Sequence, residues 1–184
     1  MQASGAWAGA QFPLVSLNLD FSADAALGGL VSSVPVDTDD TAVPEAGSVK
    51  SRLVPVTVVE KGGEKIGVVG ITTQLLGSLS SPEGTVVRGG GSVNLDVLAG
   101  QVQPWIDELE SEGINKIVLM AHLREFEEAA ELAGKLSGVD IVVVSGSRTR
   151  LGDSSDVAVN FGAGHAAEFD GSYPVLGEDR DGTP

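Results

Sequence analysis

Continuous apolar runs along the chain predict a protein of the α/β class. Residues 64–71, 116–121 and 139–144 are apolar runs of strand length. Between the last two runs, residues 123–136 carry apolar side chains at helical spacing, with glutamates on the opposite side. The apolar side of this predicted helix is formed by Leu123, Phe126, Ala130, Ala133 and Leu136. A strand, a helix and a strand of these lengths are typical of a parallel crossover. We therefore expect a mainly parallel core sheet, and the nearly all-apolar run at 116–121 predicts a strand covered on both faces.

A hairpin and a second helix complete the predicted core. The sequence "RLVPVTVVEKGGEKIGVV" predicts a strand at 53–60 that turns at the Gly-Gly pair 62–63 and returns as the strand at 64–71. Residues 95–109 place large apolar side chains at helical spacing. Pro104 lies inside this pattern, so the helix is either kinked there or divided into two helices.

The two ends of the chain follow weaker patterns. Residues 12–20 alternate apolar and polar positions and predict a strand, whereas 22–51 is rich in Pro, Gly, Asp and Ser and predicts a long irregular surface loop. The final residues, "EDRDGTP", are typical of a turn that awaits a partner strand. We therefore expect residues 1–184 to form a single, partial domain whose uncovered sheet edges favour pairing with another chain or with a missing half.

Composition and charge narrow the classes of partner. The chain of 184 residues has 26 acidic and 11 basic residues and a formal net charge of −15. This charge repels a nucleic acid polymer and an anionic membrane surface. No apolar run approaches the roughly 20 residues that a membrane-spanning helix needs, so membrane insertion is not expected. The absence of cysteine excludes disulfides, zinc–thiolate sites and cysteine nucleophiles.

Polar residues follow each of the three predicted core strands. Thr72 and Thr73 follow the first strand, His122 follows the second, and Ser147 and Arg148 lie just beyond the third. Because ligands gather at the carboxyl ends of strands in open α/β sheets, we expect these residues to meet at one rim. Histidine is the commonest metal ligand and a proton carrier near neutral pH. His122 is therefore either a ligand at this rim or a structural histidine bonded to the backbone.

Other polar motifs are better explained by structure than by chemistry. His165 lies in a Gly-rich loop, and the glutamates of 125–131 are typical of a solvated helix face. The acidic run at 37–40 could attract Ca²⁺, but it lacks the spacing of an EF-hand loop. The sequence "VRGGGS" at 87–92 could cradle an anion through its backbone N–H groups, although such sequences are more often flexible connections.

Four segments in order resemble the later half of a calcineurin-like metallophosphoesterase domain. The nearest group is the secreted 5′-nucleotidases and related alkaline phosphatases, which typically show "FP…SAN", "G.KIGVIGLTT", "D.IV.LSHLG" and "VD.I.GGHSHT". The corresponding sequences here are "FPLVSLN", "GEKIGVVGITT", "INKIVLMAHL" and "VDIVVVSGSRT". The resemblance spans about residues 11–153. No single motif is specific, but the four occur in the family's order and spacing.

The resemblance implies a partial αββα sandwich and a hydrolase that uses two divalent cations. In such sites the cations hold a hydroxide for in-line attack on the phosphorus of a phosphate monoester, such as a nucleotide. His122 matches the histidine of the third motif, which is a metal ligand in that family. Asn18, in the first motif, joins Thr72, Thr73, Ser147 and Arg148 as a candidate substrate or rim residue. The resemblance also implies a periplasmic or extracellular protein.

The chain departs from the family at positions that bind metal. The "GHSHT" motif falls on residues 145–149, which places Gly146 and Arg148 at its two histidine positions. In a "GGSDT" variant of the motif, Arg148 stands at the Asp position instead, so a ligand is missing either way. The family's D-x-H and G-N-H-[ED] motifs, which supply most of the metal ligands, are absent.

Three hypotheses follow from this departure. The chain is part of a metallophosphoesterase and is inactive alone, since one histidine cannot hold two cations. Alternatively, it is a non-catalytic α/β binding or structural module that has lost its metals, so that it binds none. It could also be an unrelated α/β ligand-binding domain in which His122 is incidental.

Overall fold

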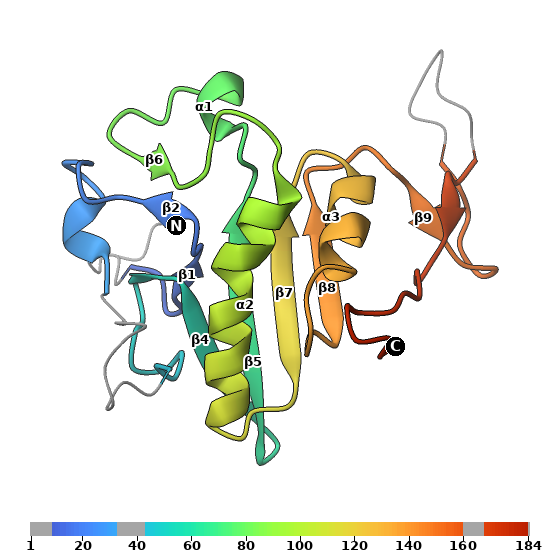
Figure 1. Ribbon diagram of the computed structural model, residues 1–184, viewed down its shortest axis with the longest axis horizontal. Coiled ribbons are helices and arrows are strands. Elements are labelled where there is room, and N and C mark those ends of the chain that lie inside the picture. Colours follow the sequence, from blue (N-terminus) through green and yellow to red (C-terminus); the bar gives the residue numbers. More distant parts are fainter. Residues whose placement is uncertain (1–8, 33–42, 160–167, 184) are drawn as a thin grey trace, which may run out of the picture.

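A four-stranded sheet forms the centre of the computed structural model, which describes residues 9–32, 43–159 and 168–183. The strands are β4 (Val56–Lys61), β5 (Glu64–Thr72), β7 (Ile117–His122) and β8 (Ile141–Ser145), in that spatial order (Figure 1). β4 is antiparallel to β5, whereas β5, β7 and β8 are parallel. The predicted α/β class, the mainly parallel sheet and the Gly-Gly hairpin are therefore confirmed, with strand ends within two or three residues of the predicted bounds.

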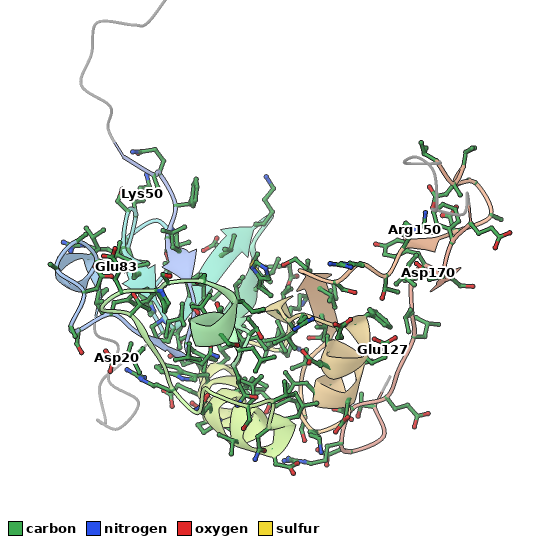
Figure 2. The ribbon with its side chains drawn as sticks, turned by 90° about the horizontal axis from the view of Figure 1, so that it is seen from above. Asp20, Lys50, Glu83, Glu127, Arg150 and Asp170 are labelled. Atoms are coloured by element: carbon green, nitrogen blue, oxygen red, sulfur yellow. The ribbon has the colours of Figure 1, made fainter. Side chains whose placement is uncertain are left out.

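Two helices cover one face of this sheet. α2 (Leu95–Ser111) and α3 (Phe126–Ala133) lie on the same side of the strands (Figure 2). α2 is one helix with Pro104 inside it, so of the two alternatives the division into two helices is excluded. The Asn94 side chain caps its first turn by accepting a 3.1 Å hydrogen bond from the Val97 N–H. The apolar stripe that predicted this helix is buried: Leu95, Leu98, Val102, Trp105, Ile106 and Leu109.

The helix predicted over 123–136 is shorter than expected, and its buried side is different. Ala129 and Leu132 are its buried residues, whereas Ala130, predicted to face inward, is exposed. Leu123 and Leu136 are buried but lie outside the helix, in the segments that enter and leave it. The prediction counted these two loop residues as helical. It therefore placed the apolar side of the helix at the wrong positions.

Side chains of the sheet alternate between the helix-covered face and the opposite face. The covered face supplies the core, which includes Val56, Val69, Ile71, Ile117, Leu119 and Ala121. On the opposite face Val118 is half-buried, and Met120, Ile141 and Val143 are 49%, 55% and 47% exposed. The prediction that the strand at 116–121 is covered on both faces is therefore wrong for the described part of the chain. An apolar run alone does not tell which faces of a strand are packed.

The N-terminal segment forms short strands instead of the single strand predicted over 12–20. β1 (Leu14–Val15) pairs in parallel with β3 (Leu53–Val54), and β2 (Leu19–Asp20) pairs antiparallel with β6 (Val86–Val87). The strand is divided because its two halves pair with different partners. The connecting segments contain a 3₁₀ turn (Gly28–Leu30) and the short helix α1 (Leu76–Leu79). The predicted irregular loop at 22–51 includes residues 33–42, which lie outside the described part.

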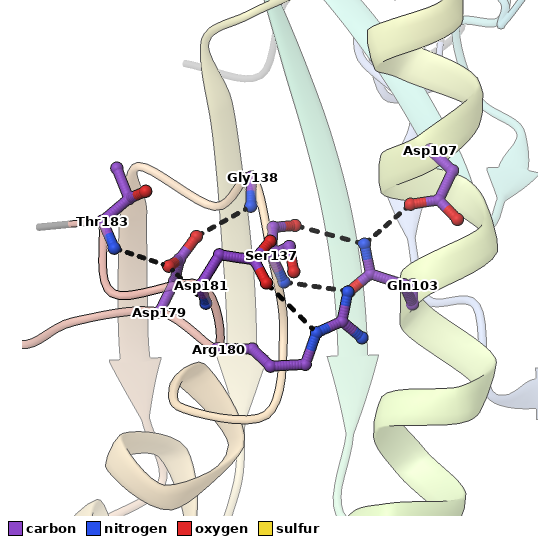
Figure 3. A network of polar contacts seen from close by, with 8 residues as sticks. All are labelled: Gln103, Asp107, Ser137, Gly138, Asp179, Arg180, Asp181 and Thr183. Carbon is purple, nitrogen blue, oxygen red and sulfur yellow. Dashed lines mark hydrogen bonds and ion pairs between the residues drawn. The ribbon is translucent and has the colours of Figure 1, made fainter.

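The C-terminal segment returns to the helical layer after a small separate sheet. β9 (Leu151–Gly152) and β10 (Gly171–Ser172) form a two-stranded parallel sheet. The Asp179 carboxylate then accepts hydrogen bonds from the N–H groups of Gly138, Asp181 and Thr183 at 3.1, 2.9 and 2.8 Å (Figure 3). These bonds, that of Thr183 first, lower the pKa of Asp179 below its ordinary value. Within the described ranges, every helix is too short or too polar to span a lipid bilayer.

Candidate functional site

The carboxyl ends of the three parallel strands lie side by side in register. Thr72 at the end of β5 pairs with His122 at the end of β7, and His122 pairs with Ser145 at the end of β8. Residues paired across parallel strands point to the same face, so these three side chains emerge on the face away from the helices. The predicted meeting of the three strand ends at one rim is confirmed.

His122 is exposed and lies against the loop that follows β8. Gly146 has a φ of +90°, and a Cβ built on it would lie 2.6 Å from His122 Cδ2 and 2.6 Å from the Leu123 carbonyl oxygen. Any side chain at position 146 would therefore collide with the imidazole and with the backbone. Glycine at this position, where the resemblance predicts a histidine, lets the loop pass directly beside His122.

Asn18 holds the end of β5 in place through its side-chain amide. The residue is completely buried, its Nδ2 donates to the Thr72 carbonyl oxygen at 2.6 Å, and its Oδ1 accepts from the Thr72 N–H at 2.9 Å. The Leu17 N–H also donates to the Gly70 carbonyl oxygen at 2.8 Å. The Asn18 side chain thus replaces a neighbouring strand and fixes the last residue of β5.

The hydroxyl groups of Thr72 and Thr73 differ in how accessible they are to a ligand. The Thr72 hydroxyl shares a 3.1 Å hydrogen bond with the Ser16 hydroxyl, and Thr72 is half-buried. Thr73 is buried, and its Oγ1 accepts a 3.2 Å hydrogen bond from the Leu75 N–H. Thr72 therefore lies at the rim, whereas Thr73 shapes the turn that leaves it.

Gln74 links the rim to the glycine-rich loop before α2, and the sequence analysis missed it. Its Nε2 donates to the Gly89 carbonyl oxygen at 2.8 Å, and its Oε1 accepts from the Asn94 N–H at 2.7 Å. The Gly91 N–H donates to the Gln74 carbonyl oxygen at 3.0 Å. This buried glutamine therefore holds the glycine-rich loop at 87–92 in place. The sequence predicted that this loop is either a flexible connection or a site that binds an anion. Its position two residues after the end of β5 was a local signal, but its hydrogen-bond partners lie 15 and 20 residues further along the chain.

Ser147, Arg148 and Thr149 form the outer part of the rim. The Ser147 hydroxyl donates to Thr149 Oγ1 at 3.0 Å and accepts from the Thr149 N–H at 3.0 Å. These two bonds hold a tight turn that leaves the Arg148 residue exposed. A guanidinium in such a position can contact an anion, but it cannot ligate a cation.

The described rim does not fit a pair of divalent cations. No group of three or more His, Asp or Glu side chains is arranged to hold a metal ion within 9–32, 43–159 and 168–183. The rim offers one imidazole together with hydroxyl and guanidinium groups, whereas two cations need several carboxylate and imidazole ligands. The acidic run at 37–40 and His165 lie outside the described residues.

Comparisons with known proteins point to one family. No family model matches the chain. It is 35% identical over 115 residues to a probable 5′-nucleotidase of Treponema pallidum, and these residues are 61% of this chain and 18% of that protein. A snake venom 5′-nucleotidase of Naja atra is 29% identical over 139 residues, which are 76% of this chain and 23% of that protein.

A solved structure shares the fold as well. The 5′-nucleotidase precursor of Thermus thermophilus superposes with a TM-score of 0.62 and 26% identity, over 91% of this chain and 26% of that chain. The chain thus spans about a quarter or less of the length of these relatives. The predicted resemblance to the 5′-nucleotidases is confirmed.

Proposed function

We propose that this chain forms one part of a metal-dependent phosphoesterase of the 5′-nucleotidase type, with His122 as a metal ligand at its rim. The register of Thr72, His122 and Ser145 carries this proposal, because it brings an exposed imidazole to the carboxyl edge of the sheet. The three proteins compared above are all 5′-nucleotidases by name. The substrate class we propose is accordingly a phosphate monoester, such as a nucleotide, hydrolysed by two-metal in-line attack of water.

The other rim residues take supporting roles in this proposal. Arg148 is exposed and would contact the phosphate group of the substrate through its guanidinium. Asn18 and Thr73 would act as positioning residues, since their polar atoms are engaged by the backbone of Thr72 and Leu75. Ser147 would hold the turn that presents Arg148.

We further propose that the chain alone neither holds two cations nor hydrolyses phosphate esters. One imidazole is the available metal-binding group at the described rim, so the other ligands would come from another chain or from a longer protein. The names "snake venom 5′-nucleotidase" and "precursor" in the relatives support an extracellular or periplasmic location for the working enzyme.

Metal titration combined with an activity assay tests the proposal. The chain is titrated with Zn²⁺ while the imidazole signals of its two histidines are followed by NMR, and hydrolysis of a nucleoside monophosphate is measured with Mn²⁺, Co²⁺, Zn²⁺ and Ca²⁺. We expect weak binding of one Zn²⁺ that moves the His122 signals, is lost in His122→Ala and persists in the matched control His165→Ala. No turnover is expected from any of the three proteins.

Two results would contradict parts of the proposal. Two tightly bound metal ions per chain, with turnover that His122→Ala abolishes, would show a complete active site in this chain. Zn²⁺ binding that is unchanged in His122→Ala would remove the ligand role.

A non-catalytic module is the second candidate function. Gly146 and Arg148 favour it, because neither can ligate a metal at the two positions where the resemblance predicts histidines. On this alternative, nucleotide or phosphate would still bind at the rim in the presence of EDTA, and Arg148→Ala would abolish that binding while His122→Ala would not.

A further inference from the structure

The Thr72 side chain is held by a hydroxyl group from a distant part of the chain. Ser16, which directly follows β1, shares a 3.1 Å hydrogen bond between its Oγ and Thr72 Oγ1. Ser16 does not depend on this bond for its place, because its own N–H donates to the Val54 carbonyl oxygen at 3.0 Å. The next two residues are bonded to β5, as described above. Ser16 therefore offers the Thr72 hydroxyl a partner in a fixed position.

The segment 16–18 lies on the side of β5 that faces away from β7. Backbone N–H and C=O groups of successive residues in a strand point alternately to its two edges. The Gly67 N–H donates to the carbonyl oxygen of Lys116, directly before β7, at 2.8 Å, so the backbone groups of Gly67 face β7. Gly70 and Thr72 are three and five residues further on, so their backbone groups point to the other edge, where they bind this segment. Figure 1 shows β1 and β2 on this β4 side of the sheet.

Gly70 lets the chain before Ser16 pass close to β5. Side chains at positions 70 and 72 point to the same face of the strand, the face away from the helices. A Cβ built on Gly70 would collide with the Val15 carbonyl oxygen, so the backbone at Val15 lies directly over this position. Ser16 therefore approaches Thr72 on the face that also carries His122.

His122 stands on the other side of Thr72, at the same level of the sheet. The two residues are paired across β5 and β7. Neighbouring strands lie about 4.8 Å apart, so a Thr72 hydroxyl turned toward β7 could reach a ring nitrogen of His122. A hydroxyl is a hydrogen-bond donor, and it would occupy the lone pair of an unprotonated ring nitrogen. With that lone pair an imidazole binds a metal ion or takes up a proton.

We propose that Ser16 is a positioning residue that keeps the Thr72 hydroxyl away from the His122 ring. Threonine is branched at Cβ and has few allowed side-chain rotamers, so a hydroxyl held by Ser16 is not free to turn toward β7. The His122 ring thus keeps its lone pair for a ligand. The importance of this lone pair rests on the function proposed above, whereas the orientation of the hydroxyl does not.

Nitrogen-15 NMR of the His122 ring tests the proposal without metal. The spectra are recorded in EDTA at a pH of about 8.5, about two units above the ordinary pKa of a free histidine, and are assigned with His122→Ala. We expect Ser16→Ala to shift the signal of the ring nitrogen that accepts a bond from the released hydroxyl. Ser16→Thr, which retains a hydroxyl, should give the wild-type signals.

A double variant separates the orientation of the hydroxyl from a general disturbance of the rim. In Ser16→Ala/Thr72→Val the threonine hydroxyl is absent, so the His122 signals should match those of Thr72→Val alone. If Thr72→Val does not fold, Thr72→Ala replaces it in both proteins. Identical His122 signals in the wild type and Ser16→Ala, or the same shift with and without the Thr72 hydroxyl, would overturn the proposal.

Zinc titration distinguishes this inference from the proposed function. We expect Ser16→Ala to bind Zn²⁺ about 2- to 10-fold more weakly than the wild type, as one competing hydrogen bond would cause, and Ser16→Thr to bind it normally. Equal affinities of the wild type and Ser16→Ala would overturn the role of Ser16. A wild-type chain that binds no Zn²⁺ would contradict the ligand role of His122 alone, and the ring signals would still decide where the Thr72 hydroxyl points.

Discussion

At the scale of single residues, the rim depends on close contacts that leave little room for substitution. Gly146 combines a positive φ with direct contact to the His122 ring and the Leu123 carbonyl group. Asn18 is equally constrained, since it is fully buried and both ends of its amide bind the Thr72 backbone. Neither residue takes part in the proposed reaction. Gly146 instead fixes the position of His122, and Asn18 fixes the position of Thr72.

Gly146→Ala should disturb the His122 ring and destabilise the fold. The new Cβ would lie within 2.6 Å of the ring and of a carbonyl oxygen, and the φ of +90° disfavours any L side chain. We expect a loss of about 1–3 kcal/mol in the free energy of unfolding and a shifted His122 imidazole signal. Urea denaturation and NMR measure the two effects.

The matched control for this change is Gly91→Ala. Gly91 has a φ of +99°, but a Cβ there would meet no atom within 4 Å. Gly91→Ala should therefore introduce backbone strain without moving the His122 ring. An unmoved His122 signal in Gly146→Ala would contradict the contact described for the rim.

The sequence predicted that Thr72 and His122 lie at neighbouring strand ends, but it did not predict the hydrogen bonds of Asn18. Position relative to the strand ends is encoded locally, in apolar runs followed by polar residues, so the rim could be predicted. The partner of Asn18 lies 54 residues further along the chain, and that pairing depends on how two distant segments meet. Gln74 was missed for the same reason, because its partners lie 15 and 20 residues away.

At the scale of elements, Asp179 fastens the C-terminal segment to the turn between α3 and β8. Three backbone N–H groups donate to its carboxylate, and the Arg180 N–H donates to the Leu136 carbonyl oxygen at 2.8 Å. The hydrogen bonds lower the pKa of Asp179 in the folded chain. They favour the charged form, so the attachment is strongest when the carboxylate is ionised.

Acidification should release this segment. A carboxylate with a lowered folded pKa contributes stability that is fully present above its unfolded pKa of about 3.9 and is lost as the pH falls through the folded pKa. We expect the amide signals of Gly138 and Thr183 to be constant from pH about 7 to about 5 and to shift below about 4. Asp179→Ala should produce the released signals at neutral pH, whereas Asp181→Ala, which removes only a 3.8 Å ion pair to Arg180, should not. Acid-independent Gly138 and Thr183 signals would refute this attachment.

A helix could be predicted correctly where all of its apolar positions are buried against the sheet. α2 matches its apolar stripe because all of the stripe faces the sheet. α3 was predicted too long because Leu123 and Leu136, though buried, belong to the segments that flank it. Sequence periodicity reports burial, and it does not separate a buried loop residue from a buried helical one.

At the scale of the whole molecule, an excess of acidic side chains surrounds an apolar core. The chain has 26 acidic and 11 basic residues, so charge repulsion opposes compaction at low ionic strength. The α/β class was predictable from the apolar runs, but the exposure of Met120, Ile141 and Val143 on the sheet face away from the helices was not. An apolar strand has the same sequence whether its second face packs on the same chain or on another surface.

Added salt should stabilise the chain. Raising NaCl from about 20 mM to about 300 mM shortens the screening length and reduces repulsion between the acidic groups, so the melting temperature should rise by about 3–8 °C. Scanning calorimetry at one fixed protein concentration measures this shift. A melting temperature that falls with salt would mean that attractive ion pairs, such as Lys135 with Asp96, outweigh the net repulsion.

The register that aligns Thr72, His122 and Ser145 also limits how the chain can vary in length. Side chains of a strand alternate between two faces, so one residue inserted into β7 ahead of His122 would turn the imidazole toward the helices and Leu119 toward water. Length changes that preserve the rim must therefore occur outside β7. Related proteins could differ in the length of their connections, while the strand itself would keep a fixed number of residues.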